Sequence, residues 1–189
     1  DVSGFPCDYD EILTMAIKQQ KLFNPSNEKQ QKLGRILIAS DAAHSFGALY
    51  KGKRSGSLAD VSCSSFHAVK NLTTAEGGAL CFNFPDDFDH DQIYSDFVTI
   101  TLHGQSKDAL AKTKKGAWKY DVVAPGYKCN MTDIQAAIGL VELDRYDENL
   151  ERRKTIFSAY EKAFSAESWA ILPSHKNSEK TSSYHLYLL

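Results

Sequence analysis

Residues 35–41 read R-I-L-I-A-S-D, a short and nearly continuous apolar run that ends in a carboxylate. Such a run is typical of a buried strand in a parallel sheet. Ligands in open α/β sheets bind at the carboxyl ends of the strands, and Asp41 lies at that end. The stretch therefore predicts an α/β fold with a functional carboxylate at Asp41.

Two further strands are expected downstream, at residues 59–66 and 79–84, with Gly77 and Gly78 turning the chain into the second of them. The chain also ends on the strand-like run Y-H-L-Y-L-L at 184–189. A protein seldom ends on such an unpaired edge, and no methionine precedes Asp1, so we expect this chain to be part of a longer one.

Helices are predicted around these strands. The spacing of apolar residues predicts an amphipathic helix over 8–18, capped by Asp8 or Asp10, and a helix followed by a short strand over 91–103. Thr132 opens a capping box, from which one long or bent helix, or two in succession, extends to about residue 164. Residues 104–119 are rich in lysine and predict a mobile surface loop that contacts the substrate or a partner subunit.

The bulk composition narrows the class of protein. The 189 residues are 42% apolar and 24% charged with a net charge of −2, which is ordinary for a globular domain and offers no basic excess for nucleic acid or anionic lipid. Cys7, Cys63, Cys81 and Cys129 are widely spaced, so they indicate neither a disulfide framework nor a zinc site, and no metal is expected. Reduced thiols and the absence of an apolar run of about 20 residues favour a cytoplasmic protein.

Lys70 stands out within residues 64–79, which read S-S-F-H-A-V-K-N-L-T-T-A-E-G-G-A. No acidic residue is closer to it in sequence than Glu76, and burial of the segment would lower the pKa of the lysine toward that of a nucleophilic amine. Pyridoxal phosphate (PLP) needs an amine for its aldehyde, an anion for its ring nitrogen and donors for its phosphate. Lys70, Asp41 and Ser65 match these three needs.

Each of these residues also has an ordinary structural reading. Lysines in loops are usually solvated, and an aspartate after a strand often caps a turn. A lone histidine is usually a core or surface residue with ordinary hydrogen bonds, which applies to His44 and His67. Asn130 suits the start of a helix. Only their joint pattern favours a cofactor site.

That pattern resembles the DegT/DnrJ/EryC1/StrS family of sugar aminotransferases, especially members that aminate a 4-keto sugar nucleotide. The resemblance covers residues 34–160 and rests on three segments of the sequence: D-A-A-H-S-F-G from position 41, S-F-H-A-V-K-N from position 65, and P-G-Y-K-C-N-M-T-D-I-Q from position 125. It implies the type I PLP fold, a mainly parallel sheet between helices followed by a smaller C-terminal domain. On this reading residues 1–145 belong to the large PLP-binding domain, and residues 146–189 form a linking helix and the start of the small domain.

The resemblance also implies roles for single residues. It assigns Lys70 to the Schiff base and proton transfer, Asp41 to the ring nitrogen, and Ser65 to the phosphate. His44 would lie beside the cofactor ring and its 3-hydroxyl, and Asn130 would reach the phosphate of a neighbouring subunit in a homodimer. His67 receives no chemical step.

The implied function is transfer of an amino group from L-glutamate to a keto group of a nucleotide-linked deoxysugar, in the biosynthesis of amino sugars for surface polysaccharide or glycan. Family members of full length carry an upstream Gly-Thr phosphate loop and a stacking aromatic residue that this sequence lacks, so we expect the piece alone to bind PLP poorly. Two alternatives stay open. One is a truncated, non-catalytic binding or dimerisation module. The other is a PLP-dependent sugar dehydratase, which the retained Lys70 disfavours because those enzymes carry histidine at this position.

Overall fold

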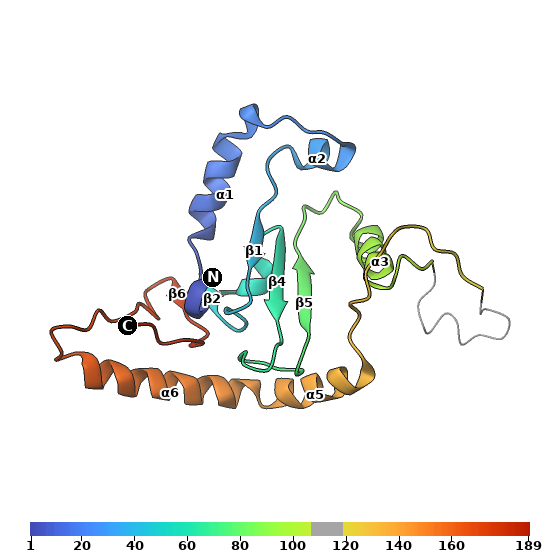
Figure 1. Cartoon of the computed structure of the whole chain (residues 1–189). Helices are drawn as coiled ribbons and strands as arrows, with labels where there is room; N and C mark the ends of the chain where they lie inside the picture. Colours follow the sequence, from blue (N-terminus) through green and yellow to red (C-terminus); the bar gives the residue numbers. More distant parts are fainter. Residues whose placement is uncertain (107–118) are drawn as a thin grey trace. The chain divides into compact units, whose positions relative to one another are not determined.

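The computed structural model describes residues 1–106 and 119–189 (Figure 1). The chain forms two compact units, one made of residues 1–83 and 134–189 and the other of residues 84–133. Most of the predicted loop at 104–119 lies outside the described residues.

A three-stranded sheet in the order β1-β4-β5 forms the centre of the first unit (Figure 1). Strands β1 and β4 run parallel, with Asp41 opposite Cys63, whereas β4 and β5 run antiparallel. All three predicted strands are therefore present, and the parallel pair brings the ends of β1 and β4 to the same edge. The bounds are β1 Ala39–Asp41, β4 Val61–Ser65 and β5 Gly78–Phe82.

Strand β1 is shorter than the predicted strand at 35–40, and Ile36 and Leu37 are exposed rather than buried. Hydrogen bonds to side chains replace the strand pairing here. The Asp60 carboxylate accepts from the backbone N–H of Ile38 at 2.8 Å, and the Arg35 guanidinium donates to the Ile36 carbonyl at 2.9 Å. Regular pairing with β4 consequently begins only at Ala39.

A second, antiparallel sheet has the order β3-β2-β6. It joins the C-terminal part of the chain to the loop after β1, because β6 pairs directly with β2. Its strands are β2 Leu49–Tyr50, β3 Lys53–Arg54 and β6 Lys180–Thr181.

The strand predicted at 184–189 is absent, and this prediction was wrong. Tyr184 has a φ of 54°, which breaks the extended conformation. The backbone instead bonds to the N-terminal segment, with Ser183 N–H donating to the Gly4 carbonyl at 3.0 Å and Leu186 N–H donating to the Ser3 carbonyl at 3.3 Å.

Four helices belong to the first unit. Helix α1 confirms the prediction at 8–18; Asp8 lies at its N-cap without a capping hydrogen bond, and its carboxylate pairs instead with Lys180 Nζ at 2.7 Å. Helices α5 and α6 follow each other almost end to end, so the predicted helical stretch is two helices in succession (Figure 1). The bounds are α1 Tyr9–Lys18, α2 Glu28–Leu33, α5 Asp133–Asp144 and α6 Tyr146–Phe164; single 3₁₀ turns span Val2–Gly4, Gln20–Leu22 and Ser55–Ser57.

The second unit contains helix α3 (His90–Thr101), which confirms the helix predicted over 91–103. The Asp89 side chain caps it by accepting from the Gln92 N–H at 2.9 Å. The short strand expected after it is reduced to an isolated bridge between Leu102 and Lys128.

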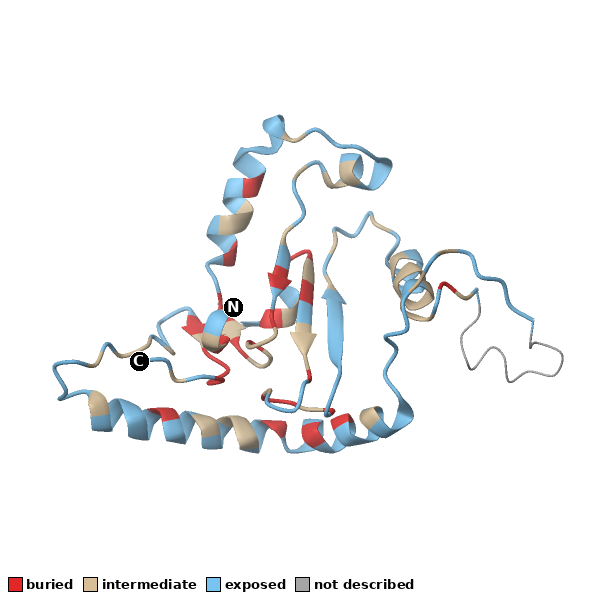
Figure 2. Ribbon diagram, viewed as in Figure 1, coloured by how far each residue is buried: buried red, intermediate tan, exposed pale blue. Residues whose placement is uncertain are grey.

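Two small apolar clusters hold the first unit together. Tyr9, Tyr50 and Ala59 form one cluster, against which Ile38 and Leu58 pack. Phe66, Leu72 and Tyr146 join the loop after β4 to α6. Figure 2 shows buried residues in β4, in the loops at its carboxyl end and along α5 and α6, whereas β5 is exposed over most of its length.

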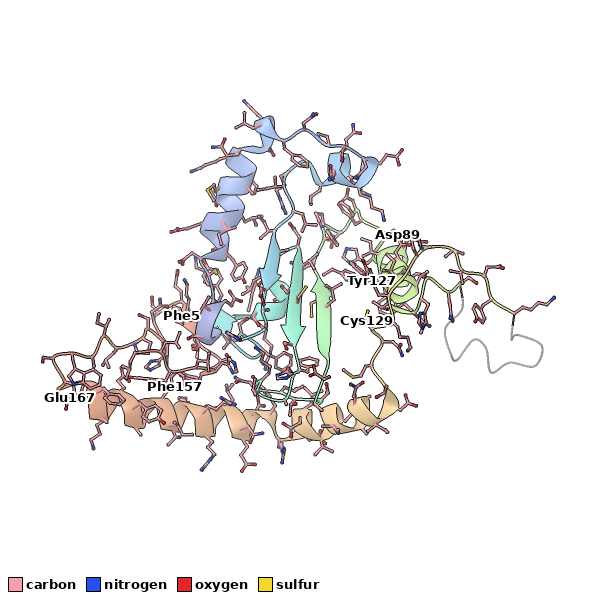
Figure 3. The ribbon with its side chains drawn as sticks, viewed as in Figure 1. Phe5, Asp89, Tyr127, Cys129, Phe157 and Glu167 are labelled. Atoms are coloured by element: carbon pink, nitrogen blue, oxygen red, sulfur yellow. The ribbon has the colours of Figure 1, made fainter. Side chains whose placement is uncertain are left out.

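The C-terminal segment packs on α6 through aromatic rings. Phe157 points from α6 toward this segment (Figure 3), and its ring meets those of Tyr184 and Tyr187 at 5.2 and 5.1 Å, both edge to face. All four cysteines are free. Among the described residues no helix has the length and apolar character needed to cross a bilayer.

Candidate active site

The loop after β1 starts the candidate site. Asp41 ends the strand, and one of its carboxylate oxygens accepts from the Ala43 N–H at 3.1 Å, which turns the chain immediately. Its Oδ2 has no hydrogen-bond partner within residues 1–106 and 119–189. One oxygen of Asp41 is therefore occupied by the turn and the other is available.

Gly47 lets this loop approach α6 closely. Its φ is 88°, and a Cβ at this position would overlap the Tyr146 ring. Tyr146 in turn donates from its hydroxyl to the Phe46 carbonyl, and the Phe46 and Phe66 rings meet edge to face at 5.5 Å. The glycine in the D-A-A-H-S-F-G segment thus allows the β1 loop to be clamped against α6.

The loop after β4 carries Lys70. Its base is anchored on both sides: Phe66 N–H donates to the Gly77 carbonyl at 2.8 Å, and Thr74 N–H donates to the Phe66 carbonyl at 2.9 Å. Leu72 and Thr74 are buried, whereas Lys70 is half-buried and its backbone N–H closes a turn with the His67 carbonyl at 2.9 Å. The fold fixes the loop around the lysine and leaves its side chain accessible.

Lys70 forms no ion pair within the described part of the chain. No carboxylate of the described residues thus lies within ion-pair distance of the Lys70 amine. Glu76, the nearest carboxylate in sequence, approaches His67 instead, with the His67 Nε2 and Glu76 Oε1 atoms 3.5 Å apart on the surface. His67 is thus paired with Glu76 at the surface.

Ser65 is the last residue of β4 and lies at the same edge of the sheet as Asp41. Its hydroxyl oxygen accepts from the His67 N–H at 3.4 Å. Because this bond uses only a lone pair, the hydroxyl hydrogen remains available for donation to an anion.

The pKa of His44 is influenced by burial and by two charged neighbours, Lys70 and Asp41. Burial lowers the pKa of His44, the positive charge of Lys70 lowers it further, and the Asp41 carboxylate opposes the shift. The imidazole is therefore neutral at pH 7. Asp41 and Ser65 thus end strands β1 and β4, and His44 and Lys70 lie in the loops that follow these strands.

Asn130 belongs to the other compact unit. Its side chain is exposed, and its Oδ1 accepts from Lys128 Nζ. The role predicted for Asn130 remains a prediction.

Sequence reasoning missed two polar residues that line this site. The ring of His185, in the C-terminal segment, contacts that of His44 at a centroid distance of 4.5 Å, and its Nδ1 lies 2.9 Å from Asn71 Oδ1. Asn71 directly follows Lys70 in the sequence. The sequence signal for His185 is the polar run Ser-Ser-Tyr-His at 182–185, because several hydroxyls and a histidine in a row are unusual in a strand that packs in a core.

A model of the DegT/DnrJ/EryC1/StrS aminotransferase family matches residues 28–189. The chain belongs to this family. The match includes all four residues that meet at the candidate site, and it extends to the C-terminal segment with His185. The sequence-based recognition of the family is thereby confirmed.

Individual relatives agree with the family match. A structure described as the sugar aminotransferase Spr1654 of Streptococcus pneumoniae, in its PMP form, is 48% identical with a TM-score of 0.92, over 98% of this chain and 46% of that one. The same protein is known in a PLP form. These likenesses confirm the predicted type I fold, of which this family member shows a part.

Two curated relatives have more specific names. The spore coat polysaccharide biosynthesis protein SpsC of Bacillus subtilis is 36% identical over 98% of this chain and 42% of its own length. The UDP-4-amino-4,6-dideoxy-N-acetyl-beta-L-altrosamine transaminase of Campylobacter jejuni is 34% identical over 99% of this chain and 42% of its own length. The chain thus spans less than half the length of the relatives it matches.

Proposed function

We propose that this family member takes part in PLP-dependent amination of a keto group on a nucleotide-linked deoxysugar, with L-glutamate as the amino donor. The observation that carries the proposal is the grouping of Lys70, Asp41, His44 and Ser65 at the carboxyl edge of the parallel pair β1 and β4. The C. jejuni and S. pneumoniae relatives, named as a UDP-sugar transaminase and a sugar aminotransferase, support the choice of reaction.

The chemistry of the side chains present fits PLP. Lys70 has an accessible amine without an ion-pair partner in the described chain, which suits the aldehyde of the cofactor. Asp41 has an unbonded carboxylate oxygen for the ring nitrogen, and Ser65 has a free hydroxyl hydrogen for the phosphate. When bound, PLP supplies an electron sink for breaking the Cα–H bond of an amino donor.

The residues of this chain then have separate tasks. Asp41 would keep the pyridine nitrogen of the cofactor protonated, because a carboxylate stabilises an adjacent cation. Lys70 would hold the cofactor through its Nζ, and the same amine, when free, would move a proton to or from the substrate carbon. A neutral His44 beside the ring adds no further positive charge near Lys70.

The remaining roles follow from the same reading. We propose that Asn130 donates to the cofactor phosphate of a neighbouring subunit in a homodimer. Residues 1–145 would belong to the PLP-binding domain and residues 146–189 to a linking helix and the start of the small domain. The setting would be cytoplasmic biosynthesis of amino sugars for surface polysaccharide or glycan, a role supported by the name of the B. subtilis relative.

A spectral titration of the full natural protein tests this function. PLP should produce an absorbance band near the visible edge, glutamate should shift it, and a UDP-linked 4-keto sugar should restore it. The variant Lys70→Ala should abolish the band, whereas Lys18→Ala, which removes an exposed lysine on α1, should keep it. A band in Lys70→Ala equal to that of the wild type, or no response to glutamate or another amino donor, would refute the proposal.

A further inference from the structure

Three polar side chains from separate segments meet beside Lys70. His44 lies in the loop after β1, Asn71 in the loop after β4, and His185 in the C-terminal segment. The two imidazole rings are 4.5 Å apart with their planes tilted by 42°, and Asn71 and His185 are each 8% exposed. The C-terminal segment also binds the backbone of the β1 loop, because Ser183 Oγ donates to the His44 carbonyl at 2.5 Å.

The hydrogen bonds of Asn71 determine the tautomer of His185. The amide nitrogen of Asn71 donates to the Ser183 carbonyl at 2.6 Å. This bond orients the amide so that Asn71 Oδ1 faces His185 Nδ1 at 2.9 Å. An amide oxygen only accepts, so Nδ1 of His185 carries the hydrogen. The lone pair of the neutral ring is then on Nε2, which bonds to no residue within 1–106 and 119–189.

Burial and the nearby positive charges together keep both rings neutral at pH 7. Burial, together with the charges of His44, Lys70 and Arg153, lowers the pKa of His185 to about 4. Burial lowers the pKa of His44, the charge of Lys70 lowers it further, and Asp41 raises it. A proton on either ring would place a second cation near Lys70.

We propose that His185 is a positioning residue of the candidate active site: its ring, held by the hydrogen bond to Asn71, fixes the orientation of His44 beside Lys70. An imidazole turns readily about its outer side-chain bond unless packing restrains it. Contact with a ring that is itself hydrogen-bonded supplies that restraint, while Ser183 holds the backbone of His44. This inference rests on the proposed function, because it concerns the geometry of the same cofactor site.

The test uses the natural protein in full length and without cofactor, with nitrogen-15 in its histidine rings. NMR of the wild type should show His185 as the Nδ1–H tautomer, with both rings titrating below pH 6.5. In His185→Ala, the His44 pKa should rise measurably toward its ordinary value. In His185→Phe, which retains a ring, most of the His44 shift should persist. The control His90→Ala changes an exposed histidine on α3 and should leave His44 unaffected.

Cofactor affinity gives a second readout. His185→Ala should weaken PLP binding about two- to tenfold, as expected from the loss of one aromatic ring contact, and His185→Phe should weaken it less. If His185→Ala does not fold, Asn71→Asp replaces it. A carboxylate facing Nδ1–H should raise the pKa of His185 well above that in the wild type.

Different results overturn the two proposals. An Nε2–H tautomer of His185 in the wild type, or a His44 titration that is identical in wild type and His185→Ala, would overturn the positioning role. An unchanged His185 pKa in Asn71→Asp would do the same. Failure of the wild type to bind PLP would overturn the proposed function alone, because the NMR measurements need no cofactor.

Discussion

Removing the Asp60 carboxylate should destabilise the protein more than removing any exposed carboxylate. Asp60 accepts two parallel hydrogen bonds from the Arg35 guanidinium, both at 2.7 Å, and a third from the Ile38 N–H at 2.8 Å. The side chains of Arg35 and Asp60 are only 12% and 5% exposed. Together these bonds hold the chain that leads into β1 and so to Asp41.

The magnitude follows from this burial. Breaking a buried ion pair by removing one partner leaves an uncompensated charge and costs about 3–5 kcal/mol. By contrast, the pair between Lys154 and Glu151 on α6 is exposed, with its nearest N–O distance at 3.0 Å. Such a surface pair contributes about 0.2–1 kcal/mol. Asp60→Ala should therefore lower the free energy of unfolding several times more than Glu151→Ala.

Urea denaturation followed by circular dichroism at pH 7 measures both variants. A double variant, Arg35→Leu with Asp60→Leu, should be more stable than Asp60→Ala alone, because it leaves no buried charge unpaired. Equal and small losses in Asp60→Ala and Glu151→Ala would refute the reasoning. So would a double variant no more stable than Asp60→Ala.

Three other predictions concern local structure. Tyr146→Phe removes the hydroxyl bond to the Phe46 carbonyl and should cost about 1–2 kcal/mol in urea denaturation, with no loss of helix signal. Gly104→Ala should cost more than about 1 kcal/mol in the same assay, because the backbone has a φ of 69° and a Cβ would overlap the Ala124 carbonyl. The pKa of His185 is about 4 in the folded protein and 6.5 as its ordinary value, so the unfolded chain binds more protons between these pH values. The stability that comes from a neutral, buried His185 is therefore complete above pH 6.5 and is lost as the pH falls toward 4. His185→Phe has no such group, so its urea midpoint should drop less between pH 7 and pH 5 than that of the wild type.

The parts of the site that lie in short, continuous segments could be predicted from the sequence. Asp41 follows an apolar run, and Ser65 and Lys70 are five residues apart around the end of the next strand. The parallel pairing of β1 and β4 then brings these segments to one edge, as expected for the carboxyl ends of parallel strands.

Other features depend on contacts between residues far apart in the sequence, and these could not be predicted. The start of β1 is set by Asp60, which lies 25 residues after its partner Arg35. The bond between Asn71 and His185 joins positions 114 residues apart. The backbone turn at Tyr184 overrides the strand preference of the run at 184–189, because local propensity is weaker than the tertiary contacts of that segment.

The central claim is that Lys70 is the amine that holds PLP. Borohydride reduction of the full natural protein with bound PLP fixes the cofactor to the lysine it occupies, and proteolysis with mass spectrometry identifies that residue. The account predicts a cofactor adduct on the peptide that contains Lys70 and none on the matching peptide of Lys70→Ala. Stoichiometric labelling of any other lysine, with Lys70 unmodified, would contradict it.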